Sequence, residues 1–327
     1  MLLAVEREMA AAGHRTMVAA CAGSRVNGRF LATGNPADGP DQYEQREREH
    51  NACILEYLGT HVDEFDLIHD KSGSFFRHAA DCLVPVLATL HLPRSFYQEE
   101  WFRNPPPNFH FNCVSQSQAS SFTDFPNPPS VVENGIELED FPFTTAKDDY
   151  LLWLGRICEE KAPHLAIAAA QKAGLPLVIA GQVYPFRYHR DYFDREIRPH
   201  LFEGSPVQFI DTPQHGQKLE LLRHARALLL TSTVEETSSL VAMEAMARGT
   251  PVVAFRRGAF PEIVADGETG FLVDTLEEMV SALSDVPRIS PQACRERVER
   301  LFTAKRMAQE YEELYRKVFA ATRREAA

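Results

Sequence analysis

The sequence predicts an α/β protein with two domains, each built on a parallel sheet, and three observations support this prediction. The chain has 327 residues, about twice the common size of a single domain. Its second half alternates short apolar runs with helical patterns, which is typical of parallel sheets. Its first half shows similar but less regular runs. Two domains of this kind would supply a cleft for a ligand.

The second half is predicted to form a doubly wound parallel sheet. Each apolar run is followed by a helical pattern, and continuous apolar runs of this length are typical of strands buried on both faces. The connections should be right-handed crossovers, and ligands of such sheets bind at the carboxyl ends of the strands. The predicted strands cover residues 150–154, 175–180, 207–210, 227–231 and 251–255.

The first half predicts a smaller α/β domain, with strands at 16–20, 65–69, 85–90 and 109–114. Glycines and prolines at 23–41 predict a mobile loop. Residues 304–320 carry apolar side chains at helical spacing and predict an amphipathic helix that packs on one of the domains. The expected organisation is a first domain at 1–146, a second at 147–303 and a helix at 304–327 that packs back toward the first.

Composition narrows the function classes. A formal net charge of −12 disfavours a broad nucleic-acid surface, and no apolar run reaches the roughly 18 residues of a membrane span. The six cysteines stand singly, without a C-x-x-C pair or a Cys/His spacing suited to zinc, so no metal site is expected. Free thiols and the absence of signal-peptide features at the start predict a cytoplasmic protein.

A tight turn follows the first strand of the second domain and holds two cations. The segment GRICEEK begins with Gly155 and places Arg156 and Lys161 five positions apart. Arginine can bind two phosphate oxygens at once and lysine adds a compact charge, so the pair suits a diphosphate. Taken alone, an Arg and a Lys near a helix start are usually solvated surface charges.

A second polar segment, EETSSLVAMEAM, follows the strand predicted at 227–231. Ser238 or Ser239 is expected to cap a helix, which puts Glu236 in the preceding loop and Glu244 inside the helix. On one helix the two carboxylates would stand about 12 Å apart, too far for the roughly 5 Å pair of a double-displacement glycosidase. They should therefore grip different parts of a ligand. On spacing alone, solvated surface carboxylates are the commoner case.

The predicted helix start also offers an anion site. Its first backbone N–H groups have no partner within the helix and point out of its N-terminus. Those of Ser239, Leu240 and Val241 should lie beside the two cations.

The order of four segments in one chain resembles family 4 of the retaining glycosyltransferases, the glycosyl transferases group 1. These segments are GRICEEKAPHLAIAAA, LPLVIAG, EETSSLVAMEAMARGTPVVAF and RGAFPEIVADGETGFLV. The resemblance is strong over about residues 150–275 and weaker elsewhere. It implies the GT-B fold, two Rossmann-like doubly wound parallel-sheet domains facing a cleft. It also implies a nucleotide-sugar donor and an acceptor, with no cofactor.

The resemblance assigns roles to particular residues. Arg156 and Lys161 would bind the donor diphosphate, Glu236 would lie against the donor sugar, and Glu244 would hold the ribose hydroxyls. His91, at the end of a first-domain strand, would point at the sugar. Gly155, Ser238, Ser239, Leu240 and Val241 would complete the donor site. His69 and Asp70 match a further family segment, for which a structural loop role is equally compatible.

Two departures from the family pattern stand out. Family members usually have Phe-Gly where this chain has Ser238-Ser239, which keeps the backbone donors but loses an aromatic wall, so an altered sugar preference is expected. Members also open with a strand and a Gly-rich loop, whereas this chain begins on the helix expected to follow them. The first domain is thus expected to lack its first strand, which makes nucleotide binding a firmer expectation than catalysis.

The resemblance implies a metal-independent hexosyl transfer with retention at the anomeric carbon, and UDP is preferred as the nucleotide from family frequency. The absence of an Asp-x-Asp segment in the matched regions agrees with a metal-independent reaction.

Two alternatives stay open: a non-catalytic nucleotide-sugar-binding protein or subunit, and a GT-B sugar-nucleotide epimerase. Stable membrane insertion is not expected, and the sequence leaves the acceptor and the oligomeric state open.

Overall fold

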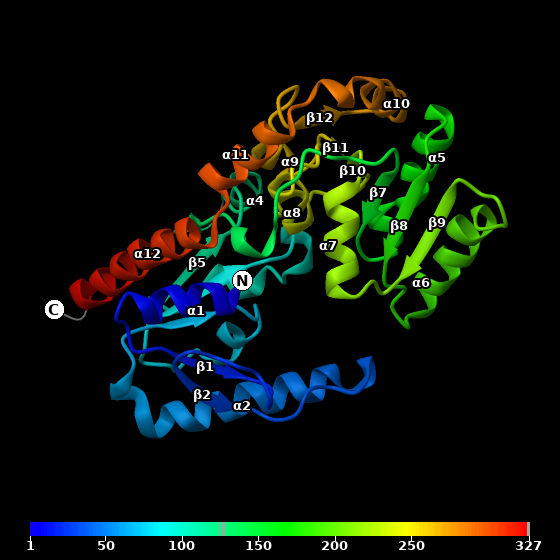
Figure 1. Ribbon diagram of the computed structural model, residues 1–327. Coiled ribbons are helices and arrows are strands. Elements are labelled where there is room, and N and C mark those ends of the chain that lie inside the picture. Colours follow the sequence, from blue (N-terminus) through cyan, green and yellow to red (C-terminus); the bar gives the residue numbers. More distant parts are fainter. Residues whose placement is uncertain (124, 126–127, 326–327) are drawn as a thin grey trace. The chain divides into compact units, whose positions relative to one another are not determined.

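The computed structural model describes residues 1–123, 125 and 128–325. The described chain divides into two units, the first made of Met1–Asn134 and Ala304–Ala327 and the second of Gly135–Thr303. Figure 1 shows the first unit in blue and cyan with its final helix in red, and the second in green to orange. Among the described residues, no helix is long and apolar enough to cross a membrane.

The second unit contains a six-stranded parallel sheet with the order β12-β11-β10-β7-β8-β9. The strands start from β7 at the centre and proceed outward on one side, then return to β10 and proceed outward on the other. Its strands are β7 (Leu151–Leu154), β8 (Leu177–Gly181), β9 (Val207–Asp211), β10 (Ala227–Leu230), β11 (Val252–Phe255) and β12 (Gly270–Val273).

This strand order creates a topological switch between β7 and β10. At such a point neighbouring connections leave toward opposite faces, and a crevice opens at the carboxyl ends of the two strands. Alternate residues of β7 serve the two faces: Leu152 and Leu154 belong to one apolar core, and Leu151 and Trp153 to the other. Burial on both faces is the physical reason that the apolar run was recognisable in the sequence.

Helices cover both faces of this sheet. The crossover helices have apolar stripes that pack on it, and short helical turns join them. The helices and helical turns of this unit are η5 (Leu138–Asp140), η6 (Glu159–Lys161), α5 (Pro163–Ala173), α6 (Arg187–Tyr192), the π-helix η7 (Phe193–Ile197), η8 (Arg198–His200), α7 (His215–His224), α8 (Leu240–Ala247), α9 (Phe260–Ile263), α10 (Leu276–Asp285), η9 (Val286–Arg288) and α11 (Pro291–Leu301).

The first unit contains a four-stranded parallel sheet, β3-β4-β5-β6, and a separate parallel pair, β1-β2. The final helix packs against α1, and Figure 1 shows the two side by side. The elements are α1 (Leu2–Ala11), β1 (Met17–Ala20), β2 (Arg29–Ala32), η1 (Pro40–Gln42), α2 (Tyr43–His61), η2 (Val62–Glu64), β3 (Ile68–Asp70), η3 (Phe75–His78), β4 (Val86–Leu90), η4 (Arg94–Phe96), α3 (Glu100–Arg103), β5 (Phe109–Cys113), α4 (Gln116–Ser120), β6 (Ser130–Val131) and α12 (Ala304–Glu325).

Three features differ from the sequence-based expectation. The segment 23–41, expected as a mobile loop, contains β2, and the Glu6 carboxylate accepts hydrogen bonds from the backbone N–H groups of Asn27 and Gly28. Strand β12 was not expected, because its short run lies in a turn-rich stretch. The units divide after Asn134 rather than after residue 146, because Ile136 and Phe141 are buried in the core of the second unit.

Candidate functional site

The switch point of the second unit carries the two polar segments singled out in the sequence. The turn at 155–161 follows β7, and the loop before α8 follows β10, so both leave the same edge of the sheet side by side. The switch-point geometry therefore places the predicted diphosphate-binding residues where a doubly wound sheet binds its ligands.

Hydrogen bonds join these two loops. Ser232 Oγ and the backbone N–H of Thr233 both donate to the carbonyl oxygen of Glu160, at 3.1 and 2.9 Å. Thr231 Oγ1 donates to the carbonyl oxygen of Ala162 at 2.8 Å. Ala162 is buried and left-handed (φ 47°), a conformation that costs about 1 kcal/mol or more for a non-glycine residue. The surrounding contacts therefore fix the backbone that carries Lys161.

The charged side chains of the site form ion pairs, one of which joins the two loops. Lys161 Nζ lies 2.5 Å from Glu236 Oε1, and the Glu236 side chain is only 12% exposed. Arg156 lies at the rim, half exposed, 3.4 Å from Glu160. The Lys161–Glu236 pair brings together one residue from each predicted motif, so the two motifs meet at this point of the structure.

The N-terminus of α8 has the predicted cap. Ser239 is the N-cap, and its Oγ accepts a hydrogen bond from the Ala242 N–H at 3.3 Å. Leu240 and Val241 lie in the first turn, where helix geometry offers their N–H groups no carbonyl partner. The Ser238 Oγ is buried without a hydrogen-bond partner among the described residues. This end of the helix is suited to an anion.

Glu244 lies inside α8, and its side chain is 12% exposed. Its carboxylate is 2.6 Å from Nζ of Lys218, which comes from the neighbouring helix α7. Lys218 was missed in the sequence, because no spacing rule relates a residue on α7 to one on α8. The pair holds the Glu244 carboxylate in one position and compensates its charge.

A third loop, which follows β11, contacts the backbone of Glu236. Gly258 has a φ of 52°, and a Cβ at this position would overlap the backbone of Glu236. The Gly258 N–H donates to Glu235 Oε2 at 2.5 Å, and the Ala259 N–H donates to the Glu236 carbonyl oxygen at 2.7 Å. The RGAFPE segment (residues 257–262) thus packs against the loop that carries Glu236. Glycine is required at position 258, where the two backbones meet.

His91 belongs to the first unit and follows β4. Its backbone N–H donates to the Tyr97 hydroxyl at 3.0 Å. Burial, followed by the charge of Lys71, lowers the pKa of His91 to about 4. The imidazole is therefore neutral near pH 7, where its ring can both donate and accept hydrogen bonds.

His69 and Asp70 have structural contacts in the same unit. Both ring nitrogens of His69 are hydrogen-bonded, one to Tyr315 Oη at 2.6 Å and the other to Thr89 Oγ1 at 2.7 Å. The Asp70 carboxylate accepts hydrogen bonds from the backbone of the following loop, including the Phe76 N–H at 3.0 Å. These contacts favour the structural role that the sequence left open.

A cavity of about 1000 Å³ lies within the first unit. Its lining includes Lys71, whose ammonium stands 3.9 Å from the centre of the Tyr311 ring and has no hydrogen-bond partner among the described residues. Burial lowers the pKa of Lys71 to about 7. A cavity of this size accommodates a small organic ligand.

We expect His91→Gln to reduce the pH dependence of stability. The folded chain disfavours the protonated imidazole, so the unfolded chain binds more protons between the ordinary pKa of 6.5 and the lowered value of about 4. The free energy of unfolding of the wild type should therefore fall as the pH drops through this window, and that of the variant should fall less. Urea denaturation at several pH values measures this, with His78→Gln, at an exposed position, as the control. If the free energy of unfolding changed equally with pH in the wild type and in His91→Gln, the lowered pKa of His91 would be contradicted.

Comparison with known proteins places this geometry in a family. The family model described as glycosyl transferases group 1 matches residues 137–300. The chain is similar to the glycogen synthase of Mycobacterium tuberculosis, with 32% identity over 186 residues, covering 53% of this chain and 44% of that protein. It is also similar to the D-inositol 3-phosphate glycosyltransferase of Corynebacterium efficiens, with 34% identity over 130 residues, covering 37% and 30%. The matched segments span less than half of each relative.

Solved structures show the same fold. The sucrose-phosphate synthase of Thermosynechococcus elongatus matches with a TM-score of 0.78 and 20% identity, covering 97% of this chain and 92% of that one. A glycosyltransferase involved in avilamycin A biosynthesis matches with a TM-score of 0.69 and 22% identity, covering 97% and 88%. These neighbours are GT-B glycosyltransferases, and the two parallel-sheet units give this chain the same fold class. Since the family model matches half of the chain, including both loops of the switch point, this protein belongs to the glycosyl transferases group 1.

Proposed function

We propose that this chain is a cytoplasmic retaining glycosyltransferase that moves a hexosyl group from a nucleotide diphosphate sugar, with UDP as the nucleotide, to an acceptor. The observation that carries the proposal is the assembly at the β7–β10 switch point. Arg156 and Lys161 offer positive charge on the turn after β7, and the N-terminus of α8 offers N–H donors after β10. Glu236 is paired with Lys161, and Glu244 lies on α8 with its carboxylate paired to Lys218. The six free cysteines are consistent with a reducing compartment.

The proposed reaction needs no covalent intermediate on the protein. The acceptor hydroxyl attacks the anomeric carbon from the face that the diphosphate leaves, and a phosphate oxygen takes the acceptor proton. Arg156, Lys161 and the N–H groups of Leu240 and Val241 stabilise the charge that accumulates on the departing diphosphate. In this proposal Glu236 holds the sugar and Glu244 binds the ribose hydroxyls, and the resemblance to the family gives the neutral His91 a role in recognising the sugar. No metal ion is required for the bond changes.

The first unit supplies the acceptor side in this proposal. Its cavity of about 1000 Å³ includes apolar surface and the partly neutral amine of Lys71. One relative is named a glycogen synthase and another a D-inositol 3-phosphate glycosyltransferase, so the acceptor of this chain is to be found by screening.

Glu244→Ala should weaken UDP binding. Calorimetry with UDP, GDP and ADP is expected to give micromolar binding of UDP, about −8 kcal/mol, to the wild type. Loss of the hydrogen bonds to the ribose should raise the Kd by about tenfold or more, because each charged hydrogen bond contributes about 1.5–3 kcal/mol. Glu220→Ala, an exposed glutamate on α7, is the matched control and should bind like the wild type. If none of the three nucleotides bound, the proposed donor site would be overturned, and a protein without glycosyltransferase activity would be favoured.

Product analysis separates the proposed transfer from the two alternatives. A transferase releases UDP only when an acceptor is glycosylated, and nuclear magnetic resonance of the product should show the anomeric configuration of the donor. An epimerase would release UDP and an epimerised sugar without any acceptor. Donor binding without product across a broad acceptor panel would favour a non-catalytic nucleotide-sugar-binding protein.

A further inference from the structure

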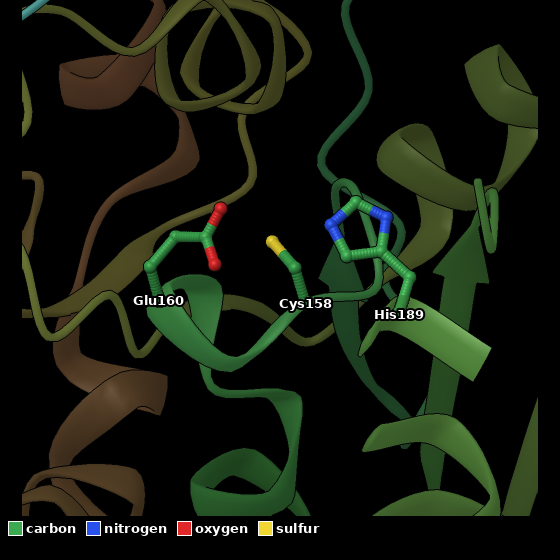
Figure 2. Close-up of side chains that lie close together, drawn as sticks. All are labelled: Cys158, Glu160 and His189. Atoms are coloured by element: carbon green, nitrogen blue, oxygen red, sulfur yellow. The ribbon is translucent and has the colours of Figure 1, made fainter. Parts of the chain in front are cut away.

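Three side chains with metal-binding atoms converge beside the phosphate-binding loop. Cys158 and Glu160 lie within the 155–161 turn, and His189 comes from α6. The thiol sulfur, a carboxylate oxygen and a ring nitrogen lie within 4.8 Å of one another. Figure 2 shows the Cys158 sulfur between the Glu160 carboxylate and the His189 ring, with one ring nitrogen directed toward the sulfur.

His189 provides an independent indication of a ligand. The residue is only 1% exposed, and neither ring nitrogen has a hydrogen-bond partner among the described residues. Leaving a buried polar group without a partner costs about 1–3 kcal/mol. The rings of Tyr184, Phe186 and Tyr188 pack around the imidazole, with ring centres 6.0, 5.6 and 4.3 Å from its own. A cation on a ring nitrogen would remove this penalty at that atom.

The other two groups are held in place by the same loop contacts that position Lys161. The Glu160 carbonyl accepts hydrogen bonds from Ser232 and Thr233, and Cys158 is fully buried, with its Sγ 3.5 Å from the Arg156 carbonyl oxygen. The Glu160 side chain is 35% exposed, which gives an ion a path from solvent. Little backbone movement is needed, because ligand atoms around tetrahedral zinc stand about 3.5 Å apart.

We propose that Cys158, Glu160 and His189 form a binding site for a single Zn²⁺ ion. Thiolate, imidazole and carboxylate together are a ligand set typical of zinc. Within the described residues, no fourth His, Cys, Asp or Glu completes the group, so water takes the remaining position. The ion ties α6 to the turn that carries Arg156 and Lys161. It supports the loop and takes no part in the bond changes proposed above.

Cobalt is the probe for this site, because tetrahedral Co²⁺ replaces Zn²⁺ and a cysteine ligand gives a thiolate-to-cobalt charge-transfer absorption. The untagged wild-type chain, titrated under reducing conditions, should develop this band together with visible d–d bands. Both should saturate at one cobalt per chain and disappear on addition of zinc. Absence of a saturating charge-transfer band in the wild type would overturn the proposal.

Variants assign the band to the three residues. Cys158→Ser should abolish the charge-transfer band, whereas Cys294→Ser, at a buried free thiol elsewhere in the same unit, should keep it. Glu160→Gln preserves side-chain shape at a partly exposed position and should raise the cobalt Kd by about tenfold or more, as should His189→Gln. Persistence of the band in Cys158→Ser, or unchanged affinity in both Glu160→Gln and His189→Gln, would also overturn it. Circular dichroism of each metal-free variant verifies folding, and UDP calorimetry tests the proposed function separately.

Discussion

Lys161→Ala is expected to lower kcat/KM for sugar transfer by about 10²–10³-fold, the loss typical when one group that stabilises a developing negative charge is removed. Lys161 Nζ lies 2.5 Å from Glu236, in a loop that is held in place by the hydrogen bond from the Thr231 hydroxyl to the Ala162 carbonyl oxygen. The ammonium is therefore already positioned when the diphosphate arrives. The measurement is steady-state transfer to the acceptor found by screening.

The same substitution leaves the Glu236 carboxylate, 12% exposed, without its cation, so stability has to be measured beside activity. Loss of one partner of a partly buried pair is expected to be destabilising, and a thermal melt reports it. Lys172→Ala is the matched control, because that lysine also pairs with a glutamate but is half exposed on α5. A Lys161→Ala enzyme that folds and turns over like the wild type would contradict the diphosphate assignment.

The sequence predicted the central part of the second unit well, and the physical reason is local. Strands β7, β8, β10 and β11 are buried on both faces, so each reads as an unbroken apolar run. The cap of α8 was equally predictable, because Ser239 acts on an N–H only three residues away. Features that depend on residues close together in the sequence could therefore be predicted.

Features that depend on distant contacts could not be predicted. Strand β2 forms by pairing with β1 and is largely exposed, so no apolar pattern marks it. Lys218 meets Glu244 only because α7 packs beside α8. Likewise, the lack of a zinc-like Cys/His spacing disfavoured a metal site, yet the fold brings His189 to Cys158 from another helix. Single-sequence spacing rules cannot detect such groups, because the spacing is created by tertiary structure.

Gly181→Ala is expected to destabilise the second unit by about 1–3 kcal/mol, the usual cost of forcing an extra methyl into a packed position. Gly181 ends β8, and a Cβ there would overlap the carbonyl oxygen of Gly155, the first residue of the turn proposed to bind phosphate. Backbone cannot yield as a flexible side chain does. The turn must move, and because Ile157 is also hydrogen-bonded to Gln182 at 3.1 Å, the movement should extend to Arg156.

Two measurements distinguish this prediction from a general effect of adding a methyl group. Urea denaturation gives the loss of stability, and UDP calorimetry at a temperature where the variant is folded should show weaker binding, because the displaced turn no longer presents Arg156 correctly. Gly216→Ala is the control. Its Cβ would meet nothing within 4 Å, and within α7 the change should add about 0.5–1 kcal/mol of stability without altering UDP affinity. If Gly181→Ala matched the wild type in both measurements, close approach of β8 to the turn would have no part in forming the donor site.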